Sequence, residues 1–251
     1  MTDDNERAWS EPEVIERYRD FSRIGPGEAA VFREVAARRR GGKILELGVG
    51  GGRITPLLLS INGDYRGLDY SAGMVALCRR RFPGAAFETG DARALDGLPA
   101  AAFDLVVFSF NGLDYASHAD RQRILATVAR RLKPGGEFVF SSHNLGMADY
   151  DRLPIPLPPL DRRLASGLRR LAKGLARHAW LKTREVRTAG YAIINEPELD
   201  YSLMTYYVRV EEQKRQLRAA GFTGNIDVFN QAGEKASSDD KSRFLYYAAG
   251  R

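Results

Sequence analysis

The sequence predicts an α/β fold in which helices cover both faces of a mostly parallel sheet. Between residues 43 and 144, short apolar runs alternate with amphipathic segments. A strand followed by a helix and a second strand forms a parallel, right-handed unit. The chain has 251 residues, which suits one large domain with a fully buried core.

Each helix and strand expected between residues 11 and 144 is predicted from a local sequence pattern. Strands are expected where apolar runs end at glycine or polar residues, at 43–49, 64–70, 85–91, 103–110 and 137–144. Helices are expected where apolar residues recur at helical spacing, at 11–22, 27–39, 53–61, 72–82 and 119–132. The tripeptide at 134–136 (PGG) predicts a tight turn before the fifth strand.

The regular alternation stops after residue 145. Four prolines, Pro154, Pro156, Pro158 and Pro159, predict an extended linker over 150–160. A basic helix with a leucine stripe is expected at 161–178, followed by β segments at 183–195 and 200–209 and a helix at 210–220. Strands at 225–230 and 242–250 close the chain as an antiparallel edge. The expected sheet has seven strands, and 146–209 is an insertion between two parts of one domain, 1–145 and 210–251.

The composition argues against several classes of protein. The net charge of +6, from 38 basic and 32 acidic residues, does not by itself indicate nucleic-acid binding. The polar N-terminus and the lack of a long apolar run predict no signal peptide and no membrane span, which favours a cytoplasmic protein. One cysteine, Cys78, and three scattered histidines give neither an internal disulfide nor a metal-binding pattern.

A glycine-rich loop follows the first strand. Its spacing is E-x-G-x-G-x-G, from Glu46 through Gly48 and Gly50 to Gly52. A dinucleotide-binding loop would carry glycine at position 53, which is Arg53, so an NAD-dependent oxidoreductase is disfavoured. Asp69 ends the next strand, where an acidic side chain can accept hydrogen bonds from both hydroxyls of a ribose. Glu46 is placed to receive a cationic amino group, and Asp91 with Ala92 suits an adenine amine.

Five segments between residues 43 and 142 occur in a set order. They are KILELGVGGGR, GLDYSAGMVALCRRRF, ETGDARAL, FDLVVFSFNGLDY and RRLKPGGEFVFSS. In this order the sequence resembles the class I S-adenosylmethionine (SAM)-dependent methyltransferase family. The resemblance implies a Rossmann-like fold, SAM as cofactor, S-adenosylhomocysteine as product and transfer of a methyl group.

The resemblance also assigns cofactor contacts by position. The methionine end of SAM would lie along Glu46, Gly48, Gly50 and Gly52, and the ribose on Asp69. Tyr70 and Met74 would pack near the adenine, Asp91 and Ala92 would fix its edge, and Phe110 and Asn111 would flank the sulfonium. Arg53 and the lid residue Tyr18 complete the expected cofactor set. Many relatives carry threonine or cysteine at the position of Gly51.

Residues after the fourth and fifth strands are candidates for the acceptor side. Methyl transfer requires alignment of nucleophile, methyl and sulfur, and a base only if the nucleophile arrives protonated. The catalytic candidates are His143, Asn111 and Tyr115, and the substrate candidates are His118, Tyr206 and Tyr207. Structural readings compete: a hydrogen-bonded His143 at a strand end, a helix-start role for His118, and a core position for one of the two tyrosines.

Residues 151–187 hold ten Lys or Arg against three Asp or Glu. The leading interpretation is methylation of an oxygen or nitrogen atom of a small metabolite, in a pocket covered by 146–209; an anionic acceptor is one alternative. The basic helix also allows a peptide, carrier-protein, membrane-surface or RNA contact. The absence of an N-P-P-[YF] motif after the fourth strand disfavours nucleic acid as substrate. A non-catalytic SAM-binding scaffold is the alternative from another class.

Overall fold

The computed structural model describes residue 5, residues 9–19, 21–38, 41–62, 64–147, 150, 157 and 164–251. The predicted linker at 150–160 and the start of the basic helix, with Arg162 and Arg163, therefore lie largely outside the described residues. Of that linker only Tyr150 and Leu157 are described, and Leu157 is exposed.

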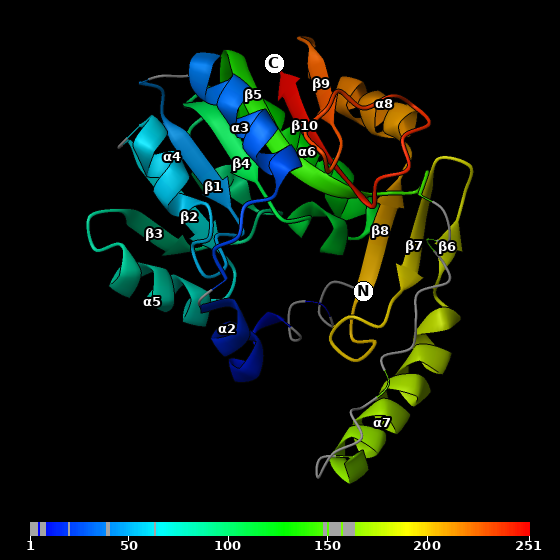
Figure 1. The fold of residues 1–251 in the computed structure, drawn as a ribbon. Coiled ribbons are helices and arrows are strands. Elements are labelled where there is room, and N and C mark those ends of the chain that lie inside the picture. The colour runs from blue at the N-terminus through cyan, green and yellow to red at the C-terminus, as the bar shows by residue number, and fades with distance from the viewer. Residues whose placement is uncertain are drawn as a thin grey trace.

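The first part of the chain forms the alternating core (Figure 1). In order, its elements are α2 (Pro12–Arg19), α3 (Pro26–Arg38), β1 (Ile44–Leu47), α4 (Thr55–Ile61), β2 (Tyr65–Asp69), α5 (Ala72–Arg81), β3 (Ala86–Thr89), η1 (Leu95–Gly97), β4 (Phe103–Phe108), η2 (Gly112–Tyr115), α6 (His118–Arg131) and β5 (Leu132–Asn144). The later elements are α7 (Leu164–Lys182), β6 (Val186–Arg187), β7 (Tyr191–Asn195), β8 (Met204–Val208), α8 (Val210–Ala220), β9 (Ile226–Phe229) and β10 (Phe244–Gly250).

Strands β3, β2, β1, β4 and β5 lie side by side in that order, and all pair in parallel. Two hydrophobic clusters cover the two faces of this sheet. One is built on α6 and α8 with residues such as Leu125 and Leu217, and the other on α3, α4 and α5 with residues such as Phe32 and Leu58. The predicted doubly wound α/β fold is confirmed, and it puts the carboxyl ends of β1, β2 and β4 at one edge.

The sheet branches at the end of β5. Residues Glu137–His143 pair antiparallel with β10, whereas His143 and Asn144 pair in parallel with β8. Beyond β8 follow β7 and β6, each antiparallel to its neighbour. The described residues thus form one ten-stranded sheet, and the predicted count of seven is wrong because the insertion adds β6, β7 and β8.

The closing pair forms the predicted antiparallel edge: β10 pairs antiparallel with β5, and β9 pairs antiparallel with β10. One smaller expectation changes. The tripeptide at 134–136, predicted as a turn, lies within the bounds of β5, where Gly135 has a positive φ of 76°. The strand register relative to β4 shifts between Phe103 and Leu105, which accommodates this irregular start.

Helix α7 lies apart from the other helices. In Figure 1 it projects away from the sheet beyond β6 and β7, and α2 lies below α5 at the carboxyl edge. Within the residues that the structure describes, none of the helices combines the length and apolar character that crossing a membrane requires.

Candidate functional site

A cavity opens at the carboxyl edge of β1, β2 and β4. Its wall contains eleven of the predicted cofactor residues: Tyr18, Glu46, Gly48, Gly50, Arg53, Asp69, Tyr70, Met74, Asp91, Ala92 and Phe110. The catalytic candidate Tyr115 also lines it. Two members of the predicted cofactor set, Gly52 and Asn111, do not reach the wall.

The glycine loop shapes the floor of the cavity. Gly48, Gly50 and Gly52 all have positive φ, which favours glycine. A Cβ at Gly50 would meet no atom within 4 Å, so this backbone stays open to a ligand. A Cβ at Gly51 would lie 2.3 Å from the carbonyl oxygen of Tyr18. Glycine at this family-variable position therefore lets the N-terminal segment rest on the loop.

Asp69 links the loop to the end of β2. Its Oδ2 accepts a hydrogen bond from the Gly50 backbone N–H at 2.9 Å, and its Oδ1 accepts one from Ser71 at 2.8 Å. Burial raises the pKa of Asp69, and these two donors act to lower it. Each carboxylate oxygen keeps a further lone pair for a ligand hydroxyl.

Glu46 lies deeper, at the end of β1. Its Oε2 accepts hydrogen bonds from the Tyr65 hydroxyl and from Thr55 Oγ1, the latter at 2.9 Å. Burial raises the pKa of Glu46 to about 7, against the lowering effect of both hydroxyl donors and of Arg53. A cationic ligand group beside Glu46 would favour its ionised form.

Arg53 is already paired. Its guanidinium forms two hydrogen bonds with the carboxylate of Glu28, at 2.5 and 2.6 Å, and both side chains are buried. The guanidinium also lies 4.9 Å from the Phe110 ring centroid and 5.9 Å from that of Phe21. This arrangement supports the aromatic wall and leaves little uncompensated charge for an anionic ligand.

Tyr70, Met74, Asp91 and Ala92 line a further part of the cavity. Asp91 Oδ2 accepts from Arg93 Nε at 2.6 Å. Burial acts to raise the pKa of Asp91, but the hydrogen bonds and charge of Arg93 leave it lowered. The carboxylate therefore stays an acceptor at neutral pH, as an adenine amine requires.

Five aromatic side chains form one wall of the cavity, and the part of the cavity that they line is called its outer half. The five are Trp9, Tyr18, Phe21, Phe110 and Tyr115. Neighbouring rings meet mostly edge to face, with centroids 5.1–6.2 Å apart. The buried Trp9 Nε1 has no hydrogen-bond partner among the residues that the structure describes. Sequence reasoning identified Tyr18 as a lid but missed Trp9 and Phe21, whose only signal was the aromatic content of the N-terminal segment.

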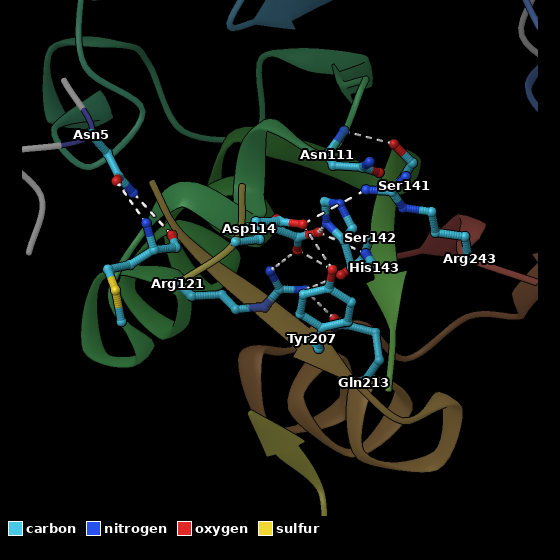
Figure 2. Close-up of polar contacts among 12 residues, drawn as sticks. Asn5, Asn111, Asp114, Arg121, Ser141, Ser142, His143, Tyr207, Gln213 and Arg243 are labelled. Carbon is cyan, nitrogen blue, oxygen red and sulfur yellow. Dashed lines mark hydrogen bonds and ion pairs between the residues drawn. The ribbon is translucent and has the colours of Figure 1, made fainter. Parts of the chain in front are cut away.

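Asn5 fastens this segment to the rest of the protein. Its Nδ2 donates to the carbonyl oxygens of Tyr115, at 2.7 Å, and Met204, at 3.1 Å, and its Oδ1 accepts from Met204 N. Figure 2 shows Asn5 with its hydrogen bonds at the left. Asn5 lines the cavity, whereas no described residue of 146–209 does. Among the described residues the N-terminal segment covers the cavity, and the predicted cover from the insertion stays a prediction.

The loop after β4 is strained. Phe110 and Asn111 have φ of 52° and 58°, values that side-chain-bearing residues seldom adopt. The Asn111 N–H donates to Ser141 Oγ at 2.8 Å, while its buried Oδ1 finds no hydrogen-bond partner in the described part of the chain. The strain turns the Phe110 side chain to the cavity wall and keeps that of Asn111 off it.

Asp114 fixes this loop through hydrogen bonds to buried residues of α6 and β5 (Figure 2). Its Oδ1 accepts from Arg121 Nη1 and Ser142 Oγ, both at 2.6 Å. Its Oδ2 accepts from the His143 N–H at 2.7 Å and lies 2.8 Å from His143 Nδ1. Arg121 also donates to Gln213 on α8. A fully buried carboxylate thus joins η2, α6 and β5 in one network.

Of the remaining candidates, His143, Tyr206 and Tyr207 are buried, and His118 is half-buried at the start of α6. His143 is buried between Asp114, Tyr207 and Phe244 and does not line the cavity, so its position does not support a role as base. His118 Nδ1 lies 2.8 Å from the Tyr206 hydroxyl, and Tyr207 donates to Glu196 at 3.0 Å. Both tyrosines are core residues, although the alternation predicted only one. No three His, Cys, Asp or Glu side chains of the described chain come together to hold a metal ion.

Comparison with known proteins agrees with this geometry. A family model described as a methyltransferase domain matches residues 44–136. Phosphatidylethanolamine N-methyltransferase from Cereibacter sphaeroides is 33% identical over 154 residues, which are 58% of this chain and 70% of that protein. Trans-aconitate 2-methyltransferase from Methylobacterium nodulans is 36% identical over 144 residues, 57% of this chain and 51% of that protein.

The fold recurs among solved structures. A SAM-dependent methyltransferase from Mesorhizobium loti aligns with a TM-score of 0.62 at 24% identity, covering 90% of this chain and 98% of that chain. The chain spans about half the length of the first curated relatives it matches, 51% and 43%. The glycine loop, the Asp69 carboxylate at the end of β2, the strand order and the relatives all agree. This chain belongs to the class I SAM-dependent methyltransferase family.

Proposed function

We propose that this protein transfers the methyl group of SAM to an oxygen or nitrogen atom of a small molecule. One observation carries the proposal. The cavity continues from Asp69 and Asp91 along the glycine loop to Trp9 and Tyr115, so it extends beyond the residues assigned to the cofactor. The outer, aromatic half is the place for an acceptor.

The residues of the inner half suit SAM. Bound SAM supplies a methyl group already activated on a sulfonium sulfur. Asp69 accepts hydrogen bonds from the ribose hydroxyls, and Glu46 receives the amino group. Phe110, Tyr18 and Trp9 exclude water from the outer half, which favours a direct displacement.

The outer half offers no ready general base among the described residues. Its ionisable members are Tyr18 and Tyr115. Burial, followed by the charge of Glu198, raises the pKa of Tyr18 to about 12 and that of Tyr115 well above its ordinary value. The proposed acceptor therefore enters with a free lone pair, as a carboxylate, a phenolate or a neutral amine does.

The names of the relatives support methyl transfer but do not identify the methyl acceptor. One is a phosphatidylethanolamine N-methyltransferase and another a trans-aconitate 2-methyltransferase, so the acceptors in these names differ in chemistry.

Calorimetric titration with SAM and S-adenosylhomocysteine tests the cofactor assignment. Asp69→Asn keeps one acceptor oxygen for the loop but loses the charge, and we expect it to weaken binding about tenfold or more. Asp64→Asn is the matched control, because Asp64 only faces Lys43 at the surface, at 3.8 Å. Failure of folded wild-type protein to bind either ligand would refute the proposal.

A screen of amine and acid acceptors then tests catalysis. Formation of S-adenosylhomocysteine should depend on an added acceptor and should fall in Trp9→Ala, which opens the outer half. Ligand binding without turnover on any acceptor class would favour the scaffold alternative.

A further inference from the structure

Helix α7 carries an exposed apolar stripe. Ala165, Leu168, Ala172, Leu175 and Ala179 recur every three or four residues and so share one side of the helix. All five are exposed, with 50% of Leu168 and 38% of Leu175 accessible. An exposed stripe of this length calls for a partner.

The helix rests on the protein by its opposite side. Gly174 and Leu181 are its buried residues, and Leu181 packs with Ile193 and Met204 of β7 and β8. Arg170 Nε pairs with Asp200 at 2.7 Å, and Arg177 donates to Ser202. At 100° per residue, Gly174 and Leu181 lie about 150° from the middle of the stripe. The stripe therefore faces outward.

Positive charge runs alongside the stripe. Residues 164–184 contain six Lys or Arg and no Asp or Glu. Arg169 and Lys173 are exposed on one flank of the helix, about 80° and 120° from the middle of the stripe, and neither forms an ion pair within the described chain. Trp180, 51% exposed, lies on the same flank. An apolar side bordered by cations and an indole is the pattern of helices that lie in the interface of anionic membranes.

We propose that α7 is a docking surface for an anionic lipid membrane. The helix would lie flat, with Leu168 and Leu175 among the acyl chains and Arg169 and Lys173 at the headgroups. Its projection from the body (Figure 1) allows this without any movement of the sheet. The proposal does not depend on methyl transfer, since no residue of α7 lines the cavity.

Other partners fit less well. RNA or an acidic protein would engage the cations but gives no reason for a continuous leucine and alanine stripe. A second copy packed on the stripe would bring two sets of cations together, with no acidic residue on either helix to pair with them. A lipid surface satisfies the charge and the apolar stripe together.

Vesicle sedimentation with the full chain tests this inference. Wild type should bind phosphatidylcholine vesicles that contain phosphatidylglycerol, bind pure phosphatidylcholine vesicles weakly, and lose binding as salt rises. Arg169→Gln/Lys173→Gln and, separately, Leu168→Gln/Leu175→Gln should each weaken binding about tenfold or more. Arg80→Gln/Lys241→Gln removes the same charge from exposed positions elsewhere and should change binding less than about twofold.

The variants change exposed side chains only, so their melting temperatures and SAM titrations should match wild type. Absence of wild-type binding, or an equal loss in the control variant, would overturn the proposal. So would light scattering that shows self-association abolished by Leu168→Gln/Leu175→Gln without vesicle binding. Binding of RNA or polyglutamate that survives the leucine changes, without vesicle binding, would overturn it in favour of those partners.

Discussion

Two carboxylates beside the cavity, both at strand ends, are held by different hydrogen-bond donors. Asp69 and Glu46 both end buried strands, yet Asp69 is held by two backbone N–H groups and Glu46 by two hydroxyls. Backbone donors near a loop of positive φ make Asp69 part of the loop's structure. Glu46, at 1% exposure, retains a proton up to about pH 7.

The pKa of Glu46 predicts a pH-dependent stability. Because folding raises it from 4.5 to about 7, the folded protein binds this proton more tightly than the unfolded chain. Glu46 therefore contributes stability that is fully present below about pH 4.5 and is lost as pH rises to 7. Melting temperatures of ligand-free protein should show this slope, and Glu46→Gln, which keeps the acceptor for Tyr65 and Thr55, should flatten it.

The same residue predicts proton release on SAM binding. An ammonium group beside Glu46 favours the carboxylate, so affinity for SAM should rise as pH increases through about 7. Titrations in buffers of different ionisation enthalpy measure the released proton. A pH-independent affinity that Glu46→Gln leaves unchanged would contradict the assignment of Glu46 to the amino group.

At the scale of elements, the cavity wall depends on η2 and on the N-terminal segment. Neither has much regular structure of its own: η2 has four residues, and it follows two residues of positive φ. Asp114 holds η2 from the core side, and Asn5 ties it to the N-terminal segment and β8. Both contacts join residues that are far apart in sequence.

Loss of the Asp114 charge should lower the stability of the folded protein. Asp114→Asn leaves Arg121 buried without its carboxylate, and we expect the free energy of unfolding to fall by about 3 kcal/mol. Urea denaturation measures this change. Asp96→Asn is the matched control: Asp96 also pairs with an arginine, Arg131, but is 82% exposed, so its loss should cost less than about 1 kcal/mol.

Asn5 should control how long a ligand stays bound. Asn5→Ala removes three hydrogen bonds that hold the N-terminal segment, and dissociation of SAM should become about tenfold faster. Stopped-flow displacement by S-adenosylhomocysteine gives this rate. Asn62→Ala, which removes a bond to Gly42 away from the cavity, should leave it unchanged.

At the scale of the whole molecule, one sheet joins the cofactor side to the insertion. Its branch at His143 places β8 directly beside β5, so β6, β7 and β8 of the insertion extend the core sheet. The N-terminal segment then becomes the cover, and α7 is left at the periphery. The predicted division into 1–145, 146–209 and 210–251 stays a prediction.

Ligand binding should therefore stabilise the molecule as a unit. S-adenosylhomocysteine at a hundred times its dissociation constant should add about 2.7 kcal/mol, or about 5–10 °C in melting temperature for a chain of this size. Differential scanning calorimetry would show one shifted transition. Two transitions, with only one shifted, would show that the insertion unfolds separately from the core.

The sequence by itself determined the alternating core, the glycine loop and Asp69, because these depend on short-range patterns: apolar periodicity, positive φ and strand ends. Family membership followed from the same local motifs. The tertiary structure decided which side chains reach the cavity. His143, Tyr206 and Tyr207 have promising positions in the sequence but point into the core, and Asn111 is turned away by strain at its own backbone. Trp9, Phe21 and Asn5 reach the cavity through contacts with residues up to 199 positions away, and no local pattern encodes such a contact.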